Sequence, residues 1–81
     1  MRQSGPSATA FYLMGLERDA TGNPSEAAAY YRKALYLDPN HYDTQIHLAL
    51  LIEKQGDAAG ALVLRNRARR LEQKSKAPPN G

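Results

Sequence analysis

The chain contains no cysteine, so neither a disulfide nor a thiolate-bound metal can stabilise its fold. It also contains no apolar run near the roughly 18 residues that a membrane-spanning helix requires. Residues 1–7 lack the apolar stretch of a secretory signal peptide. With 81 residues, the chain has the length of one small domain, too small to enclose a large buried pocket. We therefore expect a cytoplasmic protein with no membrane insertion.

The constellations of side chains that support catalysis or metal binding are also missing from the sequence. His41 and His47 are six residues apart, a spacing that does not place them on one helix face as a metal-binding pair. Thr44 lies three residues before His47, but no carboxylate is obviously placed to orient that imidazole. The glycines are scattered and form no phosphate-binding run. The sequence predicts no catalytic, cofactor-binding or metal-binding residue, and hence a chain that is not an enzyme and takes no cofactor.

What the sequence does contain is an internal repeat with a period of 34 residues. Residues 8–41 form the first copy, and residues 42–75 follow without a gap as the second. A fixed period of this length is typical of proteins built from stacked helix pairs, which form binding surfaces more often than catalytic sites. The aligned pairs include Met14 with Leu48, Gly15 with Ala49, Gly22 with Gly56, Ala27 with Ala61, and Ala34 with Ala68.

Each copy carries the signals of two helices joined by a short turn. Gly22 can adopt the left-handed conformation that ends a helix, and Pro24 suits the first position of the next one. Asn23 can cap that second helix, with Glu26 completing a capping box. Apolar residues recur at helical spacing between these turns. The sequence predicts four helices, near residues 8–21, 24–37, 42–55 and 58–73.

The apolar residues at helical spacing are interpreted as a packed core and not as a cofactor pocket. Small residues at Ala27 and Ala34 would let the two helices of a pair approach closely. Truncation of Phe11 to alanine is expected to cost about 3–5 kcal/mol, as for a buried aromatic side chain. The predicted core consists of Phe11, Met14, Tyr31, Leu35, Leu48, Ile52 and Leu64.

These positions resemble the tetratricopeptide repeat, a family of antiparallel helix pairs. Arg18 departs from the family pattern in the first copy, where tyrosine is usual. In the second copy, Gln45 and Arg65 replace aromatic residues and Gln73 replaces a proline. The matching residues of the first copy are Phe11, Met14, Gly15, Ala27, Tyr31, Ala34 and Pro39, and those of the second are Leu48, Ala49, Ile52, Gly56, Asp57, Ala61 and Ala68.

The resemblance implies an all-α fold of two tandem tetratricopeptide repeats, with four antiparallel helices and no strands. It places the folded domain at residues 8–75, with the first repeat at 8–41 and the second at 42–75. Residues 1–7 and 76–81 are expected to be flexible ends of this domain.

In tetratricopeptide folds the first helix of each pair lines a concave groove, and the resemblance implies the same here. The groove would be apolar and edged by charge, which favours docking of a peptide or a helix. Alternatively, Leu13 and Leu16 would cover a neighbouring domain of a longer protein or a second copy of this chain. With the strip open, we expect weak homodimerisation. The predicted protein-binding residues are Tyr12, Leu13, Leu16, Ile46, His47, Leu50, Glu53 and Lys54, with Thr9, Asp19 and Asp43 on the same face.

The charges of the chain are distributed unevenly. Residues 1–64 hold five basic and seven acidic side chains, whereas residues 65–81 hold six basic and one acidic. The basic stretch 65–76 could contact nucleic acid or an anionic membrane. The interpretation that we favour is a solvated outer face on a last helix that no further repeat covers. No aromatic residue is interleaved with these arginines, so a stacking platform for single strands is missing.

Three stretches carry a more specific resemblance, namely residues 33–42, 47–51 and 56–61. They look like the C-terminal repeat region of bacterial chemotaxis-receptor methyltransferases of the Wsp type, which join an S-adenosylmethionine-dependent domain to tetratricopeptide repeats. The resemblance implies a targeting or regulatory appendage in chemosensory signalling. Its partner would be a protein or peptide: a chemoreceptor, another component of the signalling complex, or the catalytic domain of the same enzyme. The alternatives are a stand-alone adaptor, or a nucleic-acid-binding module that uses residues 65–76.

Overall fold

The structure, a computed structural model, describes residues 7–76, and the side chains of residues 7–74. Four helices occupy this part of the chain, which contains no strand. Their bounds confirm the predicted ones to within three residues at every helix end. The helices are α1 (Ala8–Ala20), α2 (Pro24–Leu37), α3 (Tyr42–Lys54) and α4 (Ala58–Lys76).

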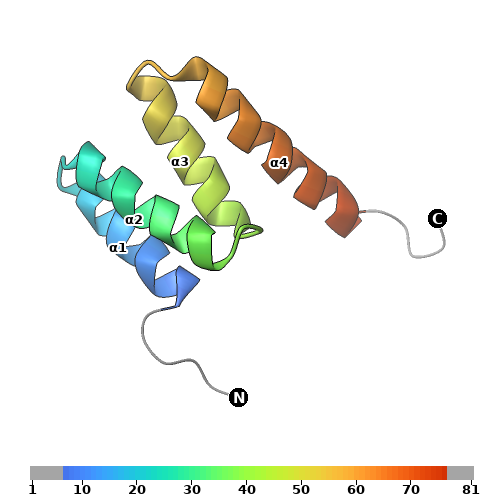
Figure 1. Cartoon of the computed structure of the whole chain (residues 1–81), viewed down its shortest axis with the longest axis horizontal. Helices are drawn as coiled ribbons and strands as arrows, with labels where there is room; N and C mark the ends of the chain where they lie inside the picture. The colour runs from blue at the N-terminus through green and yellow to red at the C-terminus, as the bar shows by residue number, and fades with distance from the viewer. Residues whose placement is uncertain (1–6, 77–81) are drawn as a thin grey trace.

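The helices form two antiparallel pairs that stack side by side, as predicted for two tandem helix-turn-helix repeats (Figure 1). Packing follows the order of the chain, with α1 on α2, α2 on α3 and α3 on α4. As a result, α2 and α3 lie in the interior of the stack, whereas α1 and α4 lie at its two ends. None of the described helices is both long enough and apolar enough to span a membrane.

The turn within each repeat is built in the same way. Gly22 and Gly56 have φ angles of +82° and +98°, in the left-handed region that favours glycine. After α1, the amide of Asn23 donates to the carbonyl of Arg18 at 2.8 Å. After α3, the amide of Asp57 donates to the carbonyl of Ile52 at 2.9 Å. Both turns are therefore Schellman motifs, in which the glycine lets the chain satisfy the last carbonyls of the helix.

The predicted helix caps are only partly correct. Pro24 occupies the first turn of α2, but Asn23 makes no capping hydrogen bond, and its side-chain amide nitrogen donates to Thr21 Oγ1. Glu26 forms no capping box and instead pairs with Arg18, its Oε1 lying 3.4 Å from Nε. In the second repeat, Asp57 Oδ1 does accept a hydrogen bond, from the Gly60 amide.

The flexible ends expected at residues 1–7 and 76–81 lie mostly outside the described part of the chain. Ser7 is described, and its Oγ accepts a hydrogen bond from the Ala10 amide, so it caps α1. Helix α4 continues to Lys76, which places that residue in the helix and not in the tail.

The core lies between the helices and confirms Tyr31, Leu48, Ile52 and Leu64 as buried, with Leu35 packed against them. The prediction of burial is wrong for two residues. Met14 is 39% exposed, and Phe11 is only half-buried. Both lie on α1 at the end of the stack, where Met14 is left exposed and the Phe11 ring has the side chains of Tyr30 and Lys33 of α2 over part of its surface. Because Phe11 is not fully buried, its truncation should cost less than the 3–5 kcal/mol of a buried aromatic.

Helices α1 and α2 touch most closely where Gly15 meets Tyr31. A Cβ atom on Gly15 would overlap the buried Tyr31 ring, so no larger residue fits without moving it. The Tyr31 hydroxyl donates to Asp19 Oδ2 at 3.3 Å, which fixes the ring over the glycine. Burial, and then the charge of Asp19, raise the pKa of Tyr31, so the hydroxyl remains a donor.

Substitution of Gly15 by alanine should destabilise the fold by about 1–3 kcal/mol, because the added methyl group forces the Tyr31 ring or α1 to move. Chemical denaturation followed by circular dichroism measures this change. The control repeats Gly15→Ala in a Tyr31→Leu background, where the ring that the methyl group would meet is absent. An equal loss in the free energy of unfolding in both backgrounds would contradict the proposed close contact.

Candidate protein-binding groove

The structure brings the first helices of the two repeats together at Tyr12. The centroid of its ring lies 5.3 Å from that of His41 and 5.4 Å from that of His47. The Thr9 hydroxyl lies 3.5 Å from His41 Nε2 on the same side. Thus Tyr12 of α1 and His47 of α3, which were predicted to share a groove, are in contact although 35 residues separate them.

Hydrogen bonds orient the rings of this cluster. His47 Nδ1 lies 2.9 Å from the backbone carbonyl oxygen of Asp43, an acceptor, so this nitrogen carries the proton. The Tyr12 hydroxyl lies 3.4 Å from the same nitrogen. Burial, and then the charge of Asp43, raise the pKa of Tyr12. Its hydroxyl therefore stays protonated at neutral pH, and the cluster offers polar groups to a bound partner.

His41 and His47, whose spacing in the sequence does not place them on one helix face, both lie against the Tyr12 ring. Across the described residues, no group of three or more histidine, aspartate or glutamate side chains could hold a metal ion. His41 Nδ1 lies 2.7 Å from the Thr44 hydroxyl, which occupies that nitrogen. The aromatic contact, and not ligation, is what the sequence failed to indicate, because residues 12, 41 and 47 meet only once α3 docks on the first repeat.

The most exposed apolar side chains of α1 and α3 are two leucines. The side chains of Leu13 and Leu50 are 56% and 48% exposed. Ile46 is half-buried. Leu16 was expected to point away from the core, and this expectation is wrong. Its side chain is half-buried and packs against the core cluster. The apolar part of the groove is therefore smaller than the sequence suggested, with Leu13 and Leu50 as its most accessible side chains.

The charged residues at the end of α3 differ in their availability. Lys54 is exposed. Glu53 forms an ion pair with Arg65 of α4, so its carboxylate serves the contact between the two helices of the second repeat. The Arg65 guanidinium, by its hydrogen bond and its charge, lowers the pKa of Glu53. Asp19 likewise accepts the hydrogen bond from Tyr31 in the first repeat.

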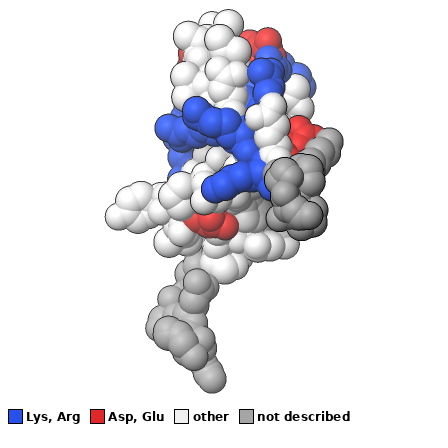
Figure 2. All heavy atoms as spheres, turned by 90° about the vertical axis from the view of Figure 1, so that its right-hand side faces the viewer, with Lys and Arg blue, Asp and Glu red and all other residues white. Residues whose placement is uncertain are grey.

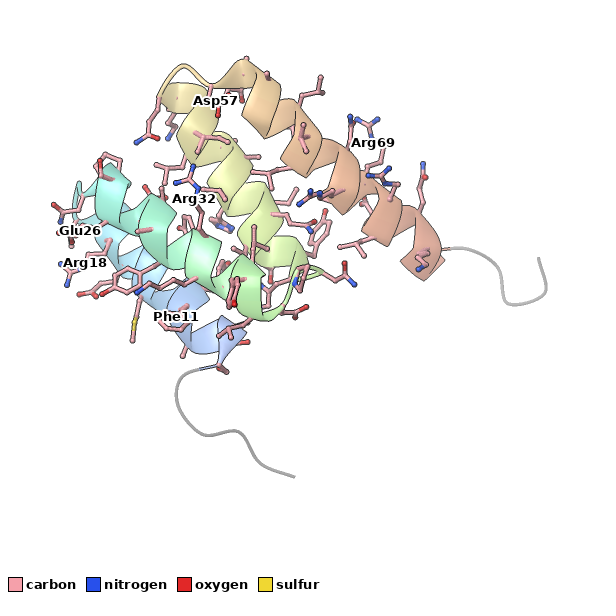
Figure 3. The ribbon with its side chains drawn as sticks, in the orientation of Figure 1. Phe11, Arg18, Glu26, Arg32, Asp57 and Arg69 are labelled. Carbon is pink, nitrogen blue, oxygen red and sulfur yellow. The ribbon has the colours of Figure 1, made fainter. Side chains whose placement is uncertain are left out.

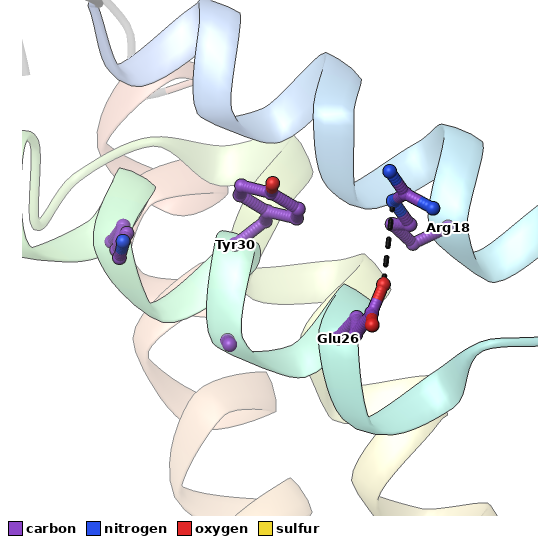
Figure 4. A pocket seen from close by; sticks show the side chains of 5 residues that line it. Arg18, Glu26 and Tyr30 are labelled. Atoms are coloured by element: carbon purple, nitrogen blue, oxygen red, sulfur yellow. Dashed lines mark ion pairs between the residues drawn. The ribbon is translucent and has the colours of Figure 1, made fainter.

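A shallow depression of about 400 Å³ lies on the outer side of α1 and α2 (Figure 4). It contains none of the predicted groove residues, and no spacing in the sequence indicated it. Figure 3 shows Phe11, Arg18 and Glu26 on this side of the molecule. The Phe11 and Tyr30 rings stack with centroids 6.2 Å apart, and Lys33 Nζ lies 5.6 Å from the Phe11 centroid. The lining residues are Arg18, Glu26, Ala29, Tyr30 and Lys33.

Comparison with known proteins agrees with this architecture. Residues 8–41 match the family model described as tetratricopeptide repeat. The chain is 53% identical over 66 residues, 82% of its length, to a protein of Pseudomonas aeruginosa named probable biofilm formation methyltransferase WspC. It is 45% identical over 75 residues, 93% of its length, to the protein of the same name in Pseudomonas putida. No solved structure matches the chain.

These matches confirm the resemblance on which the sequence analysis relied. Residues 8–41 form a tetratricopeptide repeat, and α3 with α4 repeats the same helix pair. The matched regions cover 16% and 18% of the two methyltransferases, so the chain spans less than a fifth of the length of either relative. Neither the family nor the relatives are named for nucleic-acid binding.

Replacement of Arg65 by glutamine should raise the pKa of Glu53 toward its ordinary value, because the guanidinium that favours the carboxylate is removed. A carboxyl ¹³C NMR titration of both proteins measures this shift. The pKa of Glu53 is lower in the folded state than the ordinary glutamate value of about 4.5, so the pair stabilises the folded state at pH values above 4.5. This contribution to stability disappears as the pH falls through the lowered pKa. Arg67→Gln is the control, and an equal shift in that variant would contradict the assigned pair.

Proposed function

We propose that this chain is a non-catalytic module that binds a protein segment in the groove formed by α1 and α3. The observation that carries the proposal is the pair of exposed leucines, Leu13 and Leu50, on the helices that Tyr12 and His47 bring together. Apolar anchors beside oriented polar groups suit an extended or helical peptide. The proposed binding residues are the accessible members of the predicted set: Tyr12, Leu13, Ile46, His47, Leu50 and Lys54.

We further propose that the module targets or regulates an S-adenosylmethionine-dependent methyltransferase in bacterial chemosensory signalling, in the cytoplasm. The similarity to proteins named as methyltransferases supports this role. The tetratricopeptide repeat of residues 8–41 supports an interaction role within such an enzyme. The partner would be a chemoreceptor, a component of the signalling complex or the catalytic domain itself.

Self-association is the principal alternative use of the groove. Two copies that place Leu13 and Leu50 against each other would bury the same surface twice around a two-fold axis. A nucleic-acid-binding module based on residues 65–76 remains a proposal without a supporting observation. Steep loss of affinity with rising salt would identify it, because phosphate binding releases counterions.

The groove can be tested with peptides selected from a displayed random library against the whole chain. The double variant Leu13→Asp and Leu50→Asp should reduce binding of the selected peptides by at least about tenfold, because it removes both apolar anchors. Fluorescence anisotropy measures the affinity, and circular dichroism verifies that the helices persist.

Tyr36→Asp is the matched control for this experiment, since Tyr36 is an exposed apolar residue on α2 and not on the groove helices. Its affinity should equal that of the unchanged chain. Peptides whose binding ignores Leu13 and Leu50 would refute the groove. Sedimentation velocity at rising concentration distinguishes the alternative, because a dimer through this strip would dissociate in the double variant.

The regulatory role can be tested in the relative from Pseudomonas aeruginosa. Deletion of the segment that matches this chain should leave methyl transfer to a small substrate in vitro unchanged, because the segment contains no proposed catalytic residue. Methylation of the enzyme's protein substrates in cells should fall. Quantitative mass spectrometry of methylated glutamates measures the effect. Unchanged methylation in cells would contradict a targeting role while leaving peptide binding by the groove intact.

A further inference from the structure

The face of α4 that points away from the bundle is the counterpart of a face that α3 covers in the first repeat. Ala28 of α2 is 4% exposed, whereas Leu62, 34 residues later on α4, is 57% exposed. The two residues occupy the same position of their repeats. Because α2 packs against α3 but α4 has no such neighbour within residues 7–76, the second repeat presents an open copy of an interface that is filled in the first.

The open face differs in charge from its filled counterpart. Leu35 of α2 packs against the core, but Arg69 at the same repeat position is exposed. Figure 3 shows Arg69 directed away from the bundle, and Figure 2 shows the basic side chains gathered on this side. Within the described part of the chain, Arg69 has neither an ion pair nor a hydrogen bond, unlike Arg65. The residues of this face lie four, three and four apart: Leu62, Asn66, Arg69 and Gln73.

The filled interface shows how a helix would lie on the open one. The Gln45 side-chain amide donates to the Pro39 carbonyl at 2.7 Å, which places the start of α3 beside the end of α2. Helix α3 therefore runs antiparallel to α2 (Figure 1). A helix docked in the same way on α4 would bring its N-terminal turn beside Arg69 and Gln73. Its later turns would cover Leu62.

We propose that this open face of α4 docks an amphipathic helix of another protein, apolar along one side and acidic in its first turn. The apolar side would cover Leu62, as α3 covers Ala28. The acidic turn would pair with Arg69, and acidic residues in a first turn also stabilise the helix that carries them. This surface is separate from the groove of α1 and α3, so the inference does not rest on the proposed function.

A second copy of the chain fits the face less well than an acidic helix. In a two-fold contact through α4, Arg69 would approach Arg69 of the other copy, and like charges in contact are unfavourable. In a head-to-tail contact, α1 and α2 of the other copy would present Glu17 and Glu26 together with Arg18 and Lys33, so acidic and basic side chains would be equal in number. Neither arrangement supplies an excess of carboxylates to the basic helix.

The test uses two labelled peptides with the sequence of residues 42–55, which is the helix that fills the equivalent interface. One peptide carries Thr44→Glu and Gln45→Glu, and the other carries Thr44→Lys and Gln45→Lys. Fluorescence anisotropy with the full chain measures both affinities at low and physiological salt. We expect the glutamate peptide to bind about fivefold or more tightly than the lysine peptide, because only the former complements Arg69.

Two variants of the chain locate the bound peptide. Leu62→Asp should weaken the glutamate peptide by about tenfold. Arg69→Glu should reverse the preference, so that the lysine peptide binds more tightly. The matched controls are Val63→Asp and Arg67→Glu, each an equally exposed change on an adjacent stripe of α4, and they should alter affinity less than twofold. Circular dichroism verifies that all four variants keep their helices.

Four outcomes would overturn the proposal. Equal binding of the two peptides, or equal effects of the variants and their controls, would show that Leu62 and Arg69 form no docking site. Binding that ignores Leu62→Asp would mean that the peptide displaces α3 instead. Sedimentation that reveals self-association of the chain, abolished by Arg69→Glu, would assign the face to a second copy. Duplex DNA that competes with the glutamate peptide at physiological salt would assign it to nucleic acid.

Discussion

The close approach of the two helices within a repeat is the constraint on which the rest of the structure depends. In the first repeat, Gly15 lies directly against the ring of Tyr31, and no side chain fits between them. Ala49 stands at the glycine position in the second repeat, where Arg65 replaces the tyrosine. A small residue on the first helix is thus kept, while the residue opposite it changes from aromatic to charged. The spacing of the helix pair determines where every other side chain of the repeat lies.

A second contact between the two helices of a repeat occurs at the same positions in both repeats, but it joins different side chains. The Tyr31 hydroxyl donates to Asp19 in the first repeat, and Arg65 pairs with Glu53 in the second. These two pairs occupy identical repeat positions. The first is enclosed because α3 covers the ring, whereas the second is partly exposed and bears full charges. Burial inside the stack therefore favours the uncharged hydroxyl of Tyr31 as the donor, whereas exposure at the α4 end of the stack permits the ion pair of Arg65 with Glu53.

Repetition made most of the fold predictable from sequence, because it reports contacts that recur in both copies. The helix bounds, the left-handed glycines and the buried Tyr31 all follow from positions within one repeat. Apart from the cap and capping box predicted at Asn23 and Glu26, the errors concern contacts between repeats. Met14 was expected to be buried like Leu48, but its side of α1 has no helix over it. Tyr12 and His47 were assigned to one groove, but their direct contact was not predicted, because His47 belongs to the second repeat and periodicity within a copy contains no information about contacts between copies.

The two end helices, α1 and α4, differ in how the side chains on their uncovered faces are packed and paired. At the α1 end Met14 is exposed, but the half-buried ring of Phe11 packs against Tyr30 and Lys33, and Arg18 is paired with Glu26. At the α4 end, no residue of the described chain covers Leu62. An exposed leucine beside unpaired arginine is the composition of a surface that is apolar at its centre and charged at its edge, as in protein interfaces. The end of the stack at α4 is thus the one whose chemistry fits a further partner.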